Sequence, residues 1–193
     1  MSKLVLLALV IFGAFSVNAQ TSASEIVSKI NKGETVSYEN VQVSGDLDLT
    51  RLKNTKNDSQ YPEKDKTAIV YSNIVSQPIV FRNVVFKGSL NFFRKEETST
   101  NINEYRVVFD ENVVFENCTF EQGVNFELTN FNRQVSFAGS IFNLQPRFVR
   151  IGLQKKPNIE GLVLKQNCFF QFTQTDESEI LSVADLQKIL SKF

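Results

Sequence analysis

Large apolar residues recur in this chain at alternating steps of five and six, and this spacing constrains the fold more than any other feature. An α-helix turns by about 100° per residue, so such steps would place successive members on different sides. A flat strand fails as well, because a step of five moves a side chain to the opposite face. The unbroken series is Phe109, Phe115, Phe120, Phe126, Phe131, Phe137, Phe142, Phe148, Leu153, Ile159, Leu164 and Phe170.

The spacing is explained if the chain turns between successive members. Two residues before each member lies a second, mostly small or β-branched residue, as in Val113, Cys118 and Val124. Both residues of a pair would point inward from a short strand, and the residue between them would point outward. The two or three residues that follow are rich in Asn, Gly, Gln and charge, as tight exposed turns require. The chain is therefore expected to coil around a stack of apolar side chains.

The tripeptides CTF, VNF, VSF and SIF in this series closely resemble the motif of the pentapeptide-repeat family, in its Phe-centred variant. The resemblance covers roughly residues 36–172. It implies an all-β fold, a right-handed quadrilateral parallel β-helix with four faces and 22 residues per coil. The ladder continues backward through Phe92, Phe86, Phe81, Val75 and Val70. Three earlier pairs, Val36/Tyr38, Val41/Val43 and Leu47/Leu49, complete the count, which predicts about five coils. Asn73 departs from the pattern, because it places an amide at an inward position.

Two charged, hydrophilic segments interrupt the ladder near 51–66 and 94–106 and are expected to loop out. The second is expected to add six residues to one coil, with Phe109 stacked on Phe81. A β-helix has open ends that need covers. Capping helices are predicted in residues 20–34 and 175–193, with Ser22 and Ser182 as N-caps, which leaves the β-helix to residues 35–174.

The first nineteen residues are typical of a secretory signal. They hold a Lys at position 3, an apolar core from Leu4 to Phe15, and small residues at Val17 and Ala19. We therefore predict a bacterial Sec-type signal peptide, residues 1–19, cleaved after Ala19. The mature protein would be periplasmic or secreted, without stable membrane insertion. An uncleaved membrane anchor is the alternative, although the apolar run is short for a span.

The composition excludes several kinds of chemistry. The chain has no His and no Trp, so a His-based triad, the usual zinc site and a His pH switch are absent. With 21 basic and 21 acidic residues, the net charge is near zero. That balance argues against a nucleic-acid-binding surface and equally against an acidic nucleic-acid mimic. No catalytic residue, metal site or cofactor is predicted, and no nucleic acid is expected as a partner.

Three groups of thiol and carboxylate side chains are candidates for a chemical site. Cys118 and Cys168 both occupy inward positions more than two coils apart, so we expect buried free thiols rather than a disulfide. Glu116, Glu121 and Glu127 follow successive core residues and would lie on different corners, too scattered for a carboxylate pair. The D-x-D of Asp46 and Asp48 is weak evidence for calcium.

Four valines at outward positions are the candidate binding residues: Val80, Val85, Val108 and Val114. With the assumed six-residue insertion, Val80 would stack on Val108 and Val85 on Val114, which would make an apolar strip across two faces. Such a strip is either a docking surface or ordinary strand propensity on a sheet.

These observations favour a non-catalytic exported β-helix, a scaffold or protein-interaction module, rather than an enzyme. The partner would be an unknown protein or a second copy. One alternative is an extracytoplasmic β-helix enzyme acting on polysaccharide, which would need charged groups converging on one face. The other, if the chain is not exported, is a DNA-mimicking inhibitor of a DNA-binding protein, as the resemblance suggests.

Overall fold

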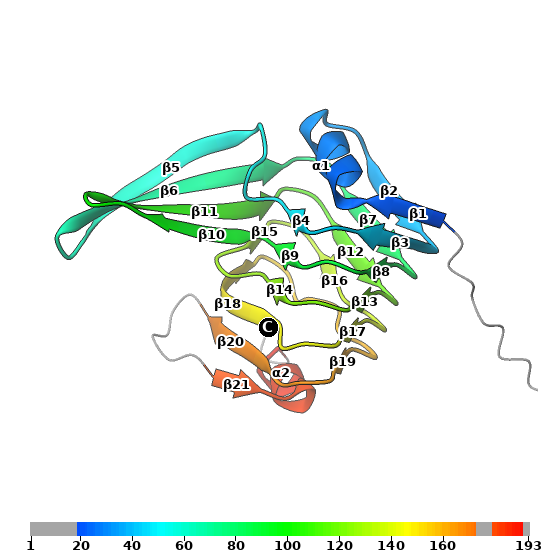
Figure 1. Cartoon of the computed structure of the whole chain (residues 1–193). Coiled ribbons are helices and arrows are strands. Elements are labelled where there is room, and N and C mark those ends of the chain that lie inside the picture. The colour runs from blue at the N-terminus through cyan, green and yellow to red at the C-terminus, as the bar shows by residue number, and fades with distance from the viewer. Residues whose placement is uncertain (1–18, 173–178, 191–193) are drawn as a thin grey trace, which may run out of the picture.

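The computed structural model describes residues 19–172 and 179–190. Residues 1–18, which hold nearly all of the predicted signal peptide, lie outside the described residues. The chain winds as a parallel β-helix with one helix at each end and an arm that projects from one side (Figure 1). The predicted all-β class, with parallel coils and terminal helices, is confirmed.

Four stacks of short strands form the four faces of the coil, numbered here in chain order. The first face is β2 (Val36–Glu39), β7 (Ile79–Arg82), β12 (Val113–Glu116) and β16 (Val135–Ser136). The second face is β1 (Ala19–Ser22), β3 (Val41–Ser44), β8 (Val85–Phe86), β13 (Thr119–Phe120), β17 (Ile141–Phe142) and β19 (Val163–Leu164).

The third face is β4 (Leu47–Asp48), β9 (Leu90–Asn91), β14 (Val124–Asn125), the start of β18 (Arg147–Leu153), β20 (Cys168–Phe172) and the antiparallel β21 (Glu179–Leu181). The fourth face is β6 (Lys66–Val75), β11 (Asn101–Phe109), β15 (Asn130–Phe131) and the end of β18. Two further strands, β5 (Thr55–Glu63) and β10 (Phe93–Glu97), flank β6 and β11. All pairings between coils are parallel.

The register between coils differs from the expected one at the second insertion. Phe115 pairs with Phe81, and Phe109 pairs with Val75. Because Phe109 itself belongs to the fourth face of the second coil, the insertion adds twelve residues to the normal 22, not six. The predicted corner between Val70 and Val75 is also absent, since both residues lie in β6.

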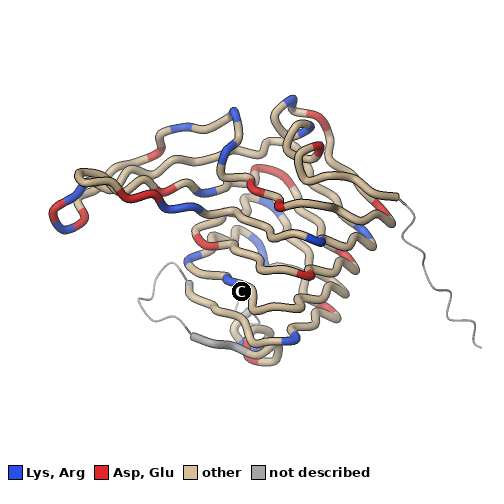
Figure 2. The backbone as a smooth tube through the Cα atoms, viewed as in Figure 1, with Lys and Arg blue, Asp and Glu red and all other residues tan. Residues whose placement is uncertain are grey.

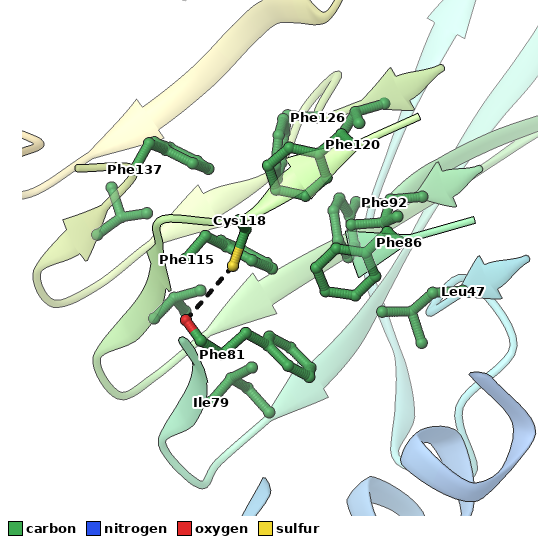
Figure 3. Packing of buried hydrophobic residues seen from close by; sticks show 14 of the residues in the cluster. Leu47, Ile79, Phe81, Phe86, Phe92, Phe115, Cys118, Phe120, Phe126 and Phe137 are labelled. Atoms are coloured by element: carbon green, nitrogen blue, oxygen red, sulfur yellow. Dashed lines mark hydrogen bonds between the residues drawn. The ribbon is translucent and has the colours of Figure 1, made fainter. Parts of the chain in front are cut away.

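Phenylalanine rings fill the axis of the coil in four columns, one for each face, and Figure 3 labels members of the first three. Within a column, stacked rings have centroids 4.3–5.6 Å apart. Each such pair contributes about 0.5–1.5 kcal/mol beyond its buried area. The alternating steps of five and six therefore have a physical purpose, because they bring one ring over the next. The columns are Phe81–Phe115–Phe137, Phe86–Phe120–Phe142, Phe92–Phe126–Phe148 and Phe109–Phe131.

The corner between the first and second faces uses a left-handed backbone in every coil. Its φ values lie between 52° and 67°, a region that Gly and Asn tolerate best. The amide of Asn83 donates to the Asn40 side-chain oxygen at 3.0 Å, which links two coils at this corner. The recurring residues are Asn40, Asn83, Asn117, Gly139 and Gly161.

Helices cover the described ends of the apolar core. In α1 (Ala23–Asn31), Ile26 and Ile30 are buried, and the Ser22 hydroxyl accepts from the Glu25 amide at 3.2 Å, as the predicted N-cap requires. β1 precedes α1 on the second face; Ala19 was predicted as the end of the signal peptide, and residues 20–22 were predicted within the N-terminal capping segment. In α2 (Val183–Leu190), Leu186 is buried against the last coils, and the Ser182 hydroxyl accepts from the Asp185 amide. Within the described residues, neither helix is long and apolar enough to cross a membrane.

Candidate interaction surface

The four candidate valines lie on three faces and do not form one strip. Val80 pairs with Val114 on the first face, and Val85 pairs with Thr119 on the second. Val108 lies on the fourth face, between Ile74 and Asn130. The expected stacking was therefore wrong, because it depended on the six-residue insertion. Each valine is partly exposed, and its role in binding stays a prediction.

The second face holds an outward apolar row that the sequence analysis missed. Val85, Thr119, Ile141 and Val163 follow one another in register, and Val163 is 45% exposed at the last strand. The signal was present in the sequence, because Thr119, Ile141 and Val163 are spaced by 22 residues. The row includes only one of the predicted valines.

The two charged insertions form an ordered arm instead of loops. The hairpins β5–β6 and β10–β11 lie side by side and extend well beyond the coil (Figure 1). They are joined because β6 and β11 pair in parallel over nine residue pairs, from Thr67–Asn101 to Val75–Phe109. The strand order across the arm is therefore β5–β6–β11–β10, a four-stranded sheet with two free edges. Both edge strands are polar and charged, which disfavours uncontrolled edge pairing.

A row of side chains crosses all four strands on one side of the arm. Arg94, Tyr105, Tyr71 and Asn57 occupy consecutive register positions on β10, β11, β6 and β5. The Tyr71 and Tyr105 rings stack with centroids 4.9 Å apart, and the Arg94 guanidinium lies 3.8 Å from the Tyr105 centroid. The tyrosine stack thus joins the two hairpins, and the cation–π contact holds β10 against β11 within one of them.

The opposite side of the arm carries a polar network. Arg106 donates to Asp58 and to the Ser72 hydroxyl, and the Tyr61 hydroxyl donates to Glu104 at 3.2 Å. The pKa of Tyr61 is raised, first by burial of part of the ring and then by the Glu104 charge, with Arg150 acting in the opposite direction. Lys66 and Glu97 form an ion pair at 2.6 Å between the two hairpins. Basic and acidic residues both occur along the arm and at its tip (Figure 2).

Asn73 is the polar residue at an inward position, and its hydrogen bonds explain why an amide is tolerated there. It is fully buried, and its side-chain oxygen accepts from the Leu52 amide at 3.0 Å and the Thr55 hydroxyl at 2.7 Å. Its amide nitrogen donates to the Arg106 carbonyl at 3.1 Å. A single side chain thus satisfies backbone groups where the first insertion leaves the coil, at Leu52, and where the second returns to it, at Arg106, and it anchors the arm to the body.

The three scattered glutamates form ion pairs with Arg or Lys side chains of a neighbouring coil. Glu116 pairs with Arg82 at 3.0 Å, Glu121 with Lys87, and Glu127 with both Arg147 and Arg150. Asp46 accepts from the Ser89 amide and hydroxyl, which lowers its pKa. Among the described residues, no three potential metal ligands lie together. These carboxylates therefore serve as links between coils.

Cys118 and Cys168 do not form a disulfide, and both thiols are buried, as predicted. The Cys118 thiol lies 3.5 Å from the Phe81 carbonyl oxygen inside the core (Figure 3). Burial raises the pKa of Cys118 to about 12, so the nucleophilic thiolate is suppressed near neutral pH.

One segment of the β-helix matches a known family of repeats. Residues 105–148 match the family model of pentapeptide repeats, in nine copies. The match covers this segment, and its ladder of stacked Phe rings is consistent with the Phe-centred form of these repeats. No curated protein and no solved structure matches the chain.

Proposed function

We propose that the protein is an exported, non-catalytic β-helix scaffold that binds a protein partner through its projecting arm. The single observation that carries this proposal is the construction of the arm. A closed stack of coils needs no such extension for its own core. The arm nevertheless has specific interactions on both sides and a buried anchor, Asn73, at its base.

Order in the arm favours binding over a role as a passive loop. An ordered surface loses less conformational entropy on association than a loop that must first become structured. Its exposed polar strand β5 and the mixed charges of its tip suit a polar protein surface rather than a lipid phase. The pairing of Glu116, Glu121 and Glu127 with basic residues of a neighbouring coil supports a non-catalytic role, because these carboxylates are engaged in holding coils together.

Site-specific photocrosslinking in the native host tests the arm directly. A photoreactive residue at Gln60, which is exposed on β5, should give a discrete adduct. A second probe at Val114 tests the paired valines of the first face. The control is Gln42, which points outward on the second face, away from the arm. Adducts of equal yield at Gln60 and Gln42, or none at Gln60, would remove the arm from the proposal.

Export is tested separately, by fractionating cells and sequencing the N-terminus of the recovered protein. A periplasmic or extracellular protein that begins at Gln20 is expected. Recovery of the intact chain from the cytoplasm would contradict export and leave the arm proposal to be judged on crosslinking alone.

A further inference from the structure

The near-zero net charge conceals a strongly basic end of the β-helix. Residues 129–172 contain six basic side chains and one acidic side chain, Glu160. Arg147 and Arg150 share the carboxylate of Glu127, at 3.2 and 3.3 Å. The other four, Arg133, Lys155, Lys156 and Lys165, have no ion pair among the described residues. Excess positive charge is therefore concentrated on the last two coils.

Three of these cations meet at one corner, between the fourth and first faces. Arg133 and Lys155 are 22 residues apart, one full coil, so they occupy the same corner position in consecutive coils. Backbone bonds fix this stacking, because the Asn132 amide donates to the Phe109 carbonyl and the Gln154 amide to the Phe131 carbonyl. The Gln134 side chain also donates to the Lys156 carbonyl at 2.6 Å.

The corner also presents two exposed amide side chains beside the cations. We call it the basic corner; it consists of Asn132, Arg133, Gln154, Lys155 and Lys156, all of which are exposed. The coil before it carries Asp110 and Glu111 at the equivalent positions, and the Asp110 carboxylate accepts from the side-chain amide of Asn132 at 3.0 Å. Carboxylates therefore border the basic corner on one side, and a bound anion would be confined to the last two coils.

We propose that the basic corner binds an acidic polysaccharide through its carboxylates. Arg and Lys recognise carboxylates, and the neighbouring amides can hydrogen-bond to hydroxyl groups. Consecutive coils repeat at about 4.8 Å, close to the length of one sugar unit in an extended chain, so successive cations match successive acidic sugars. The inference rests on the proposed export, since it requires the protein to meet polysaccharide outside the cytoplasm.

Binding of purified full-length protein to polygalacturonate, measured by titration calorimetry at low salt, tests the proposal. The test variant is Arg133→Gln/Lys155→Gln/Lys156→Gln. The matched control is Lys53→Gln/Lys56→Gln/Lys64→Gln, which removes three exposed cations that likewise lack an ion pair among the described residues. We expect the test variant to bind about tenfold more weakly or worse, and the control to bind like the unmodified protein. Added salt should weaken binding of the unmodified protein.

Further measurements exclude trivial explanations. The conservative variant Arg133→Lys should retain binding, and thermal melting of every variant checks that the coil is intact. Fully methyl-esterified polygalacturonate lacks the charge and should not bind. Equal loss in both triple variants, or no binding by the unmodified protein, would overturn the proposal.

Two other polyanion classes are outcomes of the same test. Tighter binding of the basic corner to phosphatidylglycerol vesicles or to single-stranded DNA than to polygalacturonate would overturn the assignment to polysaccharide. Failure here is distinguishable from failure of the scaffold proposal, because this assay uses purified protein and neither the arm nor the site of export affects it.

Discussion

At the corner between the first and second faces, residue identity follows from backbone conformation. Gly139 has a φ of +65°, and a Cβ built on it would overlap the side-chain oxygen of Asn117 in the preceding coil. The site thus imposes two restrictions, one on the backbone and one on space. At Asn117 only the restriction on the backbone applies, because its φ is 52° and its side chain has room.

The substitution Gly139→Ala should lower the free energy of unfolding by about 1–2 kcal/mol, since a residue with a Cβ is disfavoured in this backbone region. Urea denaturation followed by circular dichroism measures the change. Gly123→Ala is the matched control, because Gly123 lies at another corner with no heavy atom within 4 Å of a built Cβ. Equal losses in the two variants would show that the corner conformation is not the cause.

The thiols offer a second prediction at the residue scale. With Cys118 and Cys168 buried, an aromatic disulfide reagent near neutral pH should label neither in the native protein and both in concentrated guanidinium chloride.

Burial of Cys118 also makes stability depend on pH, because the thiol has its ordinary pKa of 9 in the unfolded chain and a pKa of about 12 in the folded one. Folding therefore favours the protonated thiol, and its contribution to stability should decline as pH rises from 9 to 12. Rapid labelling of either thiol in the native protein would contradict the burial on which both expectations rest.

At the scale of elements, the arm depends on contacts across strands more than on burial. The body of the helix has its apolar core, whereas β5 is exposed along almost its whole length. The row from Arg94 to Asn57 crosses all four strands and joins the two hairpins. The arm should therefore be able to open locally without unfolding of the coils.

Replacing Tyr105 with Ala should weaken the arm by about 1–2 kcal/mol, because it removes both the Tyr71 stack and the Arg94 contact. Limited trypsin digestion should then cut within 51–66 or 94–106 several-fold faster, while the β-helix body survives. Tyr105→Phe keeps the ring and should digest like the unmodified protein. If digestion of the Ala variant is unchanged, the aromatic row does not hold the arm.

At the scale of the whole molecule, stability comes from rings that contact each other between coils and within coils. Phe126 contacts the rings of Phe92 and Phe148 in its own column, with centroids 4.8 and 5.2 Å away, and the neighbouring columns as well. Each coil rests on its neighbours, so a defect in a middle coil affects both halves of the stack.

Phe126→Ala should therefore cost about 3–5 kcal/mol, the range for removing a buried aromatic ring. Urea unfolding monitored by circular dichroism gives the value. Phe169→Ala is the control, because that ring is partly exposed. The Arg147 guanidinium carbon lies 5.3 Å from the Phe169 ring centroid, and such a cation–π contact contributes about 0.5–1 kcal/mol. Comparable losses in both variants would argue against the stacked core as the main source of stability.

Much of the body was predictable because its information is local and repeated. Each face needs two inward apolar residues and a polar turn, and the steps of five and six state this along Phe109–Phe170 without reference to any distant segment. The caps at Ser22 and Ser182 were likewise readable from a few neighbouring residues. The burial of both thiols followed from the same periodicity.

Only the tertiary structure decided the arm and the surfaces that depend on register. The hydrophilic insertions contain no apolar ladder, so nothing local indicates that β6 will pair with β11, 34 residues further on. Stacking of consecutive coils brings both insertions to the same corner, and pairing of their backbones then makes one sheet. That pairing also fixes the insertion at twelve extra residues, which places the four valines on three faces. The residues that neighbour these valines on adjacent coils therefore could not be predicted from the sequence alone.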